Sequence, residues 1–174
     1  MSMVINGTSG LTMPGGQTQV GAFTSGTAVA STSGTSIDFT SIPSWVKRIT
    51  VMFNGVGTSG TSLFQVQIGS GSVANTGYVS DAMYPNGPTN SGLVTTGFVQ
   101  QGTVVASSNF QGASTLVLLN GNIWVSSGNI VDNAGRLSLN AGSKTLSGAL
   151  DRVRITTVNG TDTFSAGSIN ILYE

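Results

Sequence analysis

Apolar and polar residues alternate along much of this chain with the two-residue period of β-strands, which place successive side chains on opposite faces of a sheet. In residues 36–40, for example, Ile37 and Phe39 share one face and Asp38 lies on the other. No stretch sustains the period of an amphipathic helix. Short strands at intervals of roughly ten residues predict an all-β fold: a β-sandwich or jelly-roll-like knob.

The strongest central strand is predicted at residues 47–53. A half-exposed strand is expected at 63–68, because Gln65 and Gln67 alternate there with apolar neighbours, and we expect it to pair with the strand before it. The remaining expected strands cover residues 27–32, 36–40, 73–80, 97–105, 116–119, 122–125, 136–140, 152–156 and 168–173.

Glycine and asparagine mark the predicted turns. Asn120-Gly121 lies between two apolar runs and predicts a hairpin with a two-residue loop. In the final stretch, 148–174, two closing strands are expected around a turn at Asn159-Gly160, and the second of them finishes a sheet. Longer loops are expected at residues 81–92, 107–114 and 128–135.

The first 25 residues differ from the rest, because they contain glycines and a proline but few apolar side chains. We expect residues 1–25 to form an extended N-terminal arm that docks on a partner or intertwines with copies of itself, and residues 26–174 to form the β-sandwich knob. A disordered terminus is the alternative for the arm. The apolar residues that could anchor it are Val4, Ile5, Leu11 and Met13.

Charge is scarce: six Lys and Arg residues balance six Asp and Glu residues, and charged residues make up 7% of the chain. A neutral surface argues against nucleic acid and against an anionic membrane surface as partners. No apolar run approaches the roughly 20 residues that span a bilayer, and the start lacks the features of a secretory signal, so we expect synthesis in a cytoplasm and no membrane insertion. The absence of cysteine excludes disulfides and thiol chemistry.

The absence of histidine excludes catalytic dyads and metal sites that need imidazole. Glycoside hydrolysis needs only two carboxylates, and six exist: Asp38, Asp81, Asp132, Asp151, Asp162 and Glu174. Ion pairing is the simpler explanation for Asp151 beside Arg152, and turn roles are the simpler explanation for Asp132 and Asp162. Neither Asp132 with Asn133 nor Asp162 with Asn159 has the spacing of a calcium loop. We therefore expect no catalytic residue, no metal site and no cofactor.

Aromatic residues are the remaining candidates for surface contacts. Trp45 and Trp124 could stack on a sugar, although a place in the core or in a subunit interface is favoured for both. Tyr78 and Tyr84 border the Gly/Pro/Asn-rich loop, where rigid amphipathic rings suit recognition. The candidate contact residues in this loop and in 107–114 are Tyr78, Tyr84, Asn86, Asn90, Asn109 and Phe110.

Three stretches resemble proteins of tailed bacteriophages. Residues 148–174 (GALDRVRITTVNGTDTFSAGSINILYE) are similar to the C-terminal ending of many tail-fibre and receptor-binding proteins. Residues 35–54 (TSIDFTSIPSWVKRITVMFN) resemble the opening strands of the same domain, and 4–19 (VINGTSGLTMPGGQTQ) resemble a segment common upstream of it.

The resemblance implies a knob at the distal end of a phage fibre, assembled as a homotrimer, that attaches the virion to a host-surface glycan or protein. The contact residues named above would then face the receptor, and the arm would bind other virion proteins. Only about 25 residues precede the knob here, which is too few for a long fibre shaft. A head-fibre or capsid-decoration protein is therefore the alternative, and a polysaccharide-degrading tail enzyme a remote one.

Overall fold

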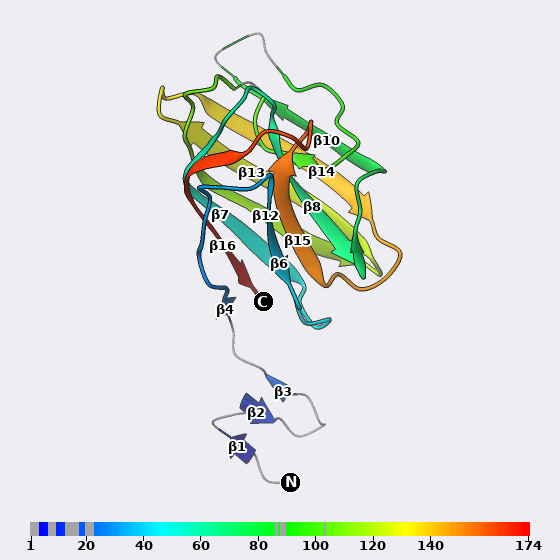
Figure 1. Ribbon diagram of the computed structural model, residues 1–174. Coiled ribbons are helices and arrows are strands. Elements are labelled where there is room, and N and C mark those ends of the chain that lie inside the picture. The colour runs from blue at the N-terminus through cyan, green and yellow to red at the C-terminus, as the bar shows by residue number, and fades with distance from the viewer. Residues whose placement is uncertain are drawn as a thin grey trace.

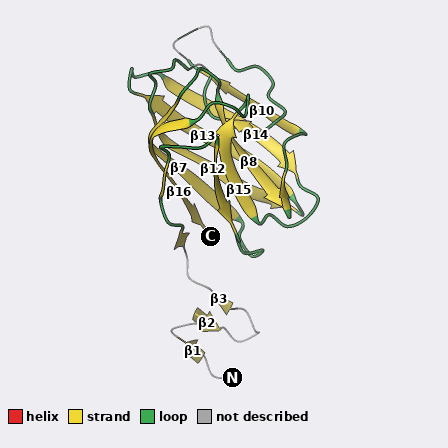
Figure 2. Cartoon of the chain, viewed as in Figure 1, coloured by secondary structure: helices red, strands yellow, loops and turns green. Residues whose placement is uncertain are grey.

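The computed structural model describes residues 4–6, 10–12, 18–19, 23–85, 87, 90–102 and 104–174. Within them, every regular element is a β-strand (Figure 2). Two antiparallel sheets enclose one hydrophobic core (Figure 1), so the predicted all-β sandwich is confirmed. This part of the chain has no helix long and apolar enough to cross a membrane.

The larger sheet has eight strands in the order β10-β14-β13-β12-β7-β16-β4, and β5 also pairs with β16. Their bounds are β4 Thr24–Ser25, β5 Val29–Ala30, β7 Arg48–Thr58, β10 Tyr78–Met83, β12 Phe110–Asn120, β13 Ile123–Asp132, β14 Leu137–Thr145 and β16 Phe164–Tyr173.

The smaller sheet has five strands in the order β11-β8-β15-β6, with β9 paired to β8. Their bounds are β6 Ser36–Thr40, β8 Phe64–Ser70, β9 Ser72–Val73, β11 Phe98–Val99 and β15 Arg152–Thr157. A third, separate sheet contains β1 (Val4–Asn6), β2 (Gly10–Thr12) and β3 (Thr18–Gln19), all within the predicted arm (Figure 1).

Every second side chain along the strands of the larger and the smaller sheet points inward, and these side chains fill the core. β7 contributes Ile49, Val51 and Phe53, all buried, as its alternation predicts. From the opposite sheet, the ring of Phe64 lies edge-on to Phe53 at 5.2 Å and to Phe110 at 5.3 Å between ring centroids. Edge-on aromatic contacts of this kind add to the hydrophobic stabilisation and hold the two sheets together.

The two closing strands do not pair with each other, contrary to the expectation from sequence. β15 lies between β8 and β6 in the smaller sheet, whereas β16 lies beside β7 in the larger one. The turn itself is where it was predicted, and Gly160 has a φ of 69°. After this turn the chain crosses from one sheet to the other, a connection that local alternation cannot distinguish from a hairpin.

The prediction for residues 63–68 is wrong in pairing and in exposure. β8 pairs with β15 rather than with β7, and both of its faces are covered, so Gln65 and Gln67 are only 2% and 6% exposed. Residues near Thr96 cover the second face, where Gln67 Nε2 donates a hydrogen bond to the carbonyl oxygen of Thr96 at 2.8 Å.

Two predicted loops are largely strand. β12 begins at Phe110 and β13 continues to Asp132, within the stretches 107–114 and 128–135. Glycine in these stretches suggests a loop. In the structure, however, Gly128 lies within β13, and Ser114 of the neighbouring strand β12 occupies the space that a Cβ of residue 128 would take. By contrast, the strand expected at 97–105 corresponds to the short strand β11. The next residue, Gln100, is held by its side chain, whose Oε1 accepts a 2.5 Å hydrogen bond from Ser114 Oγ.

The predicted hairpin is confirmed as β12–β13, but its two loop residues are Gly121 and Asn122. Asn120 pairs with Ile123, and the register shifts between Leu118 and Asn120. The irregularity at Leu118–Asn120 moves the turn by one residue, so that Gly121, with a φ of 53°, takes a position that favours glycine.

The strand register defines two ends of the sandwich. At one, β4 pairs with the last residues of β16, Leu172 and Tyr173; we call this the arm end. At the other, Phe110 pairs with Asp132, Met83 with Leu139, and Phe164 with Thr58. The segments that leave the sheets there, residues 84–85, 87, 104–109, 133–136 and 158–163, form what we call the loop end. Figure 1 shows the two ends on opposite sides of the sandwich.

Candidate functional site

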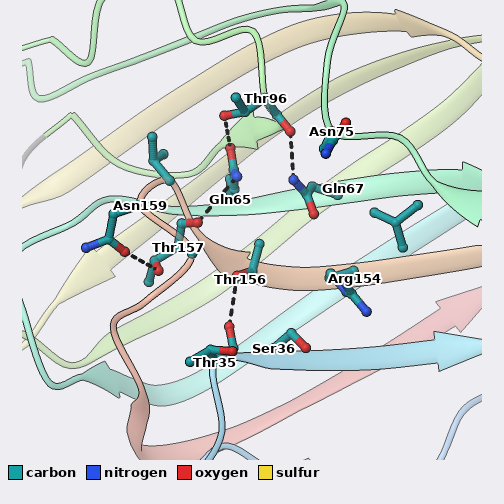
Figure 3. A pocket seen from close by; sticks show the side chains of 13 residues that line it. Thr35, Ser36, Gln65, Gln67, Asn75, Thr96, Arg154, Thr156, Thr157 and Asn159 are labelled. Atoms are coloured by element: carbon teal, nitrogen blue, oxygen red, sulfur yellow. Dashed lines mark hydrogen bonds between the residues drawn. The ribbon is translucent and has the colours of Figure 1, made fainter.

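A polar hollow of about 370 Å³ lies on the outer face of the smaller sheet (Figure 3). It is there because the core-facing residues of β8, β15 and β6 alternate with polar residues that point the other way. The lining includes the strand residues Ser36, Gln65, Gln67, Arg154 and Thr156, and the rim includes Asn75, Thr96 and Asn159. Only two lining residues, Val73 and Val158, carry aliphatic side chains.

The two glutamines at the base of the hollow are fixed by Thr96. Gln65 Oε1 accepts a hydrogen bond from Thr96 Oγ1 at 2.8 Å, and Gln65 Nε2 donates to the carbonyl oxygen of Thr157 at 3.4 Å. A Cβ at Gly97 would displace the Gln65 amide from this position, so the missing side chain leaves room for it. The amides are therefore held before any ligand arrives, which lowers the entropic cost of binding.

Gln67 has an amide oxygen with no hydrogen-bond partner among the described residues. Its Nε2 is occupied by the carbonyl of Thr96, and its Oε1 points into the hollow (Figure 3). Gln67 as a residue is only 6% exposed, but its Oε1 is not among the fully buried polar atoms without a partner, so a molecule in the hollow can reach it. A nearly buried acceptor without a protein partner gains most from a ligand that donates a hydrogen bond.

The rest of the wall is also pre-arranged. Thr156 Oγ1 donates to the carbonyl oxygen of Thr35, and Thr157 Oγ1 donates to Asn159 Oδ1, both at 2.8 Å. Asn159 Oδ1 also accepts from the backbone amide of Asp162 at 3.2 Å, which stabilises the turn.

The hollow has no net charge, because its one charged lining residue is paired. The guanidinium of Arg154 donates to both carboxylate oxygens of Asp38, at 2.7 and 3.0 Å. The hydrogen bond to Asp38 raises the pKa of Arg154 above its ordinary value, so the guanidinium keeps its charge and its partner. A neutral cavity rich in amides and hydroxyls can exchange hydrogen bonds with a neutral, hydroxyl-rich ligand such as a saccharide.

All six carboxylates have hydrogen-bond or ion-pair partners. Four are paired with arginine: Asp38 with Arg154, Asp132 with Arg136, Asp151 with Arg152, and Glu174 with Arg48. The other two accept hydrogen bonds, Asp81 from Ser91 Oγ and Asp162 from Asn159 Nδ2. Among the described residues, no three metal-binding side chains of the His, Cys, Asp or Glu type come together.

Two predicted contact residues are wrong, because they belong to the core. Tyr78 is 1% exposed, and its hydroxyl donates to the carbonyl oxygens of Ala74 and Ile68 at 3.0 and 3.1 Å. Its burial raises the pKa of the Tyr78 phenol well above the ordinary value. Phe110, 3% exposed, is part of the aromatic contact that joins the sheets.

The other predicted contact residues lie at or beside the loop end. Tyr84 is half-buried against Gly87, whose amide donates to the carbonyl oxygen of Tyr84 at 3.1 Å. Asn90 is exposed and bridges to Met83 through the backbone. The backbone of Asn109 is hydrogen-bonded to that of Asn133, with the amide of Asn133 donating at 3.0 Å. Asn86 lies outside the described residues.

The two tryptophans differ in exposure. Trp124 is buried, as the core interpretation predicts, whereas Trp45 is 39% exposed and packs against Tyr173 at 6.0 Å between ring centroids.

In the arm, Ile5 pairs with Leu11 and Val4 with Thr12 through the backbone of β1 and β2. Met13 lies outside the described residues.

An ion pair between the buried Asp132 and the partly exposed Arg136 stabilises the loop end. Burial opposes ionisation of Asp132, but hydrogen bonds from Arg136 and from the amide of Ala134 outweigh it and lower the pKa of the Asp132 carboxyl. Arg136 also donates to Ser108 Oγ at 2.7 Å, so the cluster ties the segment before β12 to the turn after β13. Because folding lowers the pKa of Asp132, this stabilisation is fully present at a pH above the pKa of aspartate in the unfolded chain, about 3.9. It is lost as the pH falls through the lower pKa of the folded protein.

We therefore expect Asp132→Asn to lower the free energy of unfolding at pH 7 by about 2 kcal/mol, the scale of a hydrogen bond to a charged group. Urea unfolding between pH 7 and pH 2 measures it. The difference in free energy of unfolding between wild type and variant should shrink on acidification. Asp151 also has a pKa lowered by its hydrogen bond with Arg152, but both proteins contain it, so its contribution cancels in this difference. A difference that stays constant with pH would contradict this role.

Comparison of the chain with models of protein families, with curated proteins and with solved structures finds no match.

Proposed function

We propose that this protein is a structural protein of a bacteriophage virion, the knob of a tail fibre or receptor-binding protein, and that it attaches the particle to a glycan on the host surface. It would assemble as a homotrimer and join other virion proteins through its N-terminal arm. The resemblance of residues 4–19, 35–54 and 148–174 to phage fibre proteins supports the class of protein.

The single structural observation that carries the binding role is the neutral hollow with the unpartnered Oε1 of Gln67. Thr96 holds both glutamines in place, and Asp38 neutralises Arg154, so the site favours hydrogen bonding over ionic recognition. Its placement is consistent with attachment at a distance from the arm. Ser36, Thr156 and Gln65 are cross-strand neighbours near the end of β15 that leads to the loop end, whereas β4 leaves from the arm end.

The proposal predicts that variants of the hollow lose glycan binding. Gln67→Met removes the unpartnered oxygen, together with the hydrogen bond from Nε2 to Thr96, with little change in volume. Asn75→Ala removes an exposed amide from the rim. Each should weaken binding about tenfold, the equivalent of one good hydrogen bond. The measurement is binding of the labelled protein to an array of neutral bacterial surface glycans.

Asn90→Ala is the matched control, because Asn90 is an exposed asparagine away from the hollow. Thermal unfolding of each variant separates lost binding from lost folding. If Asn90→Ala abolished binding and the hollow variants bound normally, the receptor site would belong to the loop around Tyr84 instead. A wild-type protein that bound no glycan would contradict the proposed ligand class.

A head-fibre or capsid-decoration protein on the virion surface is the second candidate. It differs in two measurable ways. The copy number of a decoration protein follows the symmetry of the capsid, and particles without it still adsorb to host cells. A tail-fibre knob is needed for adsorption and is present in few copies per particle.

A further inference from the structure

The outer face of the larger sheet carries an apolar surface that the core does not use. Strands β10, β14, β13 and β12 lie side by side there, and their outward residues follow from the register and the alternation of burial. The large outward apolar side chains, each at least 36% exposed, are Val79, Met83, Val117, Ile123, Leu137 and Leu139. We call this surface the apolar face.

Charge is nearly absent from the apolar face. Asp81 is the sole charged residue among the outward positions of these four strands, all of which are described, and it accepts a hydrogen bond from Ser91 Oγ at 2.7 Å. The smaller sheet differs, because its outer face carries Asp38, Arg152 and Arg154. Single exposed apolar residues are normal on any protein, but a group of them on one sheet face with so little charge is typical of an interaction surface.

The apolar face is large enough for a stable contact between proteins. Four strands at a spacing of about 4.8 Å span roughly 19 Å, and nine residues at about 3.4 Å each extend roughly 31 Å. The flat projection is therefore on the order of 600 Å², and side chains that stand out from the sheet increase the true area. A standard specific interface buries about 800 Å² per partner.

The apolar face contains both projections and depressions. Leu93 and Val79 project strongly, at 69% and 61% exposed. They border a depression of about 430 Å³ that also reaches Ala141 and Gly142, where side chains are small or absent. A second depression of about 240 Å³ lies next to it, between Met83 and Leu139. A contact between identical copies needs one surface that carries both shapes, and the apolar face carries both.

We propose that a second copy of this chain covers the apolar face, so that copies assemble with their larger sheets turned toward a shared symmetry axis. Projecting side chains of one copy fill depressions of the next. The smaller sheet of each copy, with the polar hollow, then faces outward. This contact rests on the proposed homotrimer, for which it supplies the interface, and it does not depend on what the hollow binds.

Light scattering of the purified full-length chain over a range of concentrations tests the proposal. We expect a trimer for the wild type, with a mass that is insensitive to salt. The double variant Leu137→Glu/Leu139→Glu should weaken association by roughly a hundredfold or more, because charges buried without partners carry a large desolvation cost. The matched control is Val105→Glu at the loop end, where Val105 is 44% exposed, close to the 41% of Leu139.

A second pair of variants keeps the test valid if the glutamate variant is poorly folded. Leu137→Lys/Leu139→Lys should also be monomeric alone, and mixing it with the glutamate variant should restore association. A monomeric wild type, or an assembly that persists unchanged in both double variants, would overturn the proposal. Loss of assembly with unchanged glycan binding per chain would show that the apolar face and the hollow act independently.

Discussion

Replacing Gly167 with alanine is expected to lower the free energy of unfolding by about 4 kcal/mol, a large fraction of the stability of an ordinary domain. Gly167 has a φ of 87°, in a region that side-chain-bearing residues rarely adopt. In addition, a Cβ at this position would overlap the carbonyl group of Gly55 on the adjacent strand β7. Both effects act at an irregularity in the β7–β16 ladder, where the register shifts between Ala166 and Ser168.

Gly160→Ala is the matched control for this prediction. Gly160 also has a positive φ, 69°, but nothing lies within 4 Å of the position its Cβ would take. Its replacement should therefore cost about 1 kcal/mol, the strain of the backbone alone. Urea unfolding of both variants measures the two values, and equal destabilisation would show that the close approach of Gly167 to Gly55 is unimportant.

Phe110→Ala is expected to lower the free energy of unfolding by roughly 3–5 kcal/mol, the usual range for deleting a buried phenylalanine. The ring is 3% exposed and meets Phe64 of the opposite sheet edge-on, so its loss leaves a cavity between the sheets. Chemical unfolding measures the change. Under conditions where the variant stays folded, glycan binding should equal that of the wild type, because Phe110 does not line the hollow.

Val105→Ala is the comparison for Phe110→Ala. It removes an exposed apolar side chain from the same end of the sandwich and should change the stability by no more than about 0.5 kcal/mol. If Phe110→Ala were as stable as the wild type but lost binding, the original interpretation of Phe110 as a contact residue would be restored.

Local patterns in the sequence predict the strands better than their partners. The alternation around Ile37 and Phe39 predicts β6 with the bounds it has, and Asn120-Gly121 marks the hairpin to within one residue. The separation of β15 and β16 into different sheets could not be predicted, because sheet membership depends on contacts between distant parts of the chain. Asp38 meets Arg154 across 116 residues, for example.

The candidate site was missed for the same reason. Gln65 and Gln67 show the alternation of a strand with one face in water, and nothing nearby in the sequence indicates that Thr96 covers that face. Tyr78 shows the reverse case: a tyrosine beside a polar loop resembles a contact residue, but the carbonyl of Ile68 accepts its hydroxyl within the core. Long-range partners decide whether a polar group is presented or buried.

The position of β16 in the larger sheet has a consequence for biosynthesis. β16 lies between β7 and the short strands β4 and β5, yet a ribosome makes it after every other described strand. Until it emerges, one edge of β7 stays unpaired, and an unpaired edge can recruit strands from other chains. Closure of the sandwich must therefore follow translation of residues 164–173, and crowded nascent chains are most prone to aggregate in the interval before it.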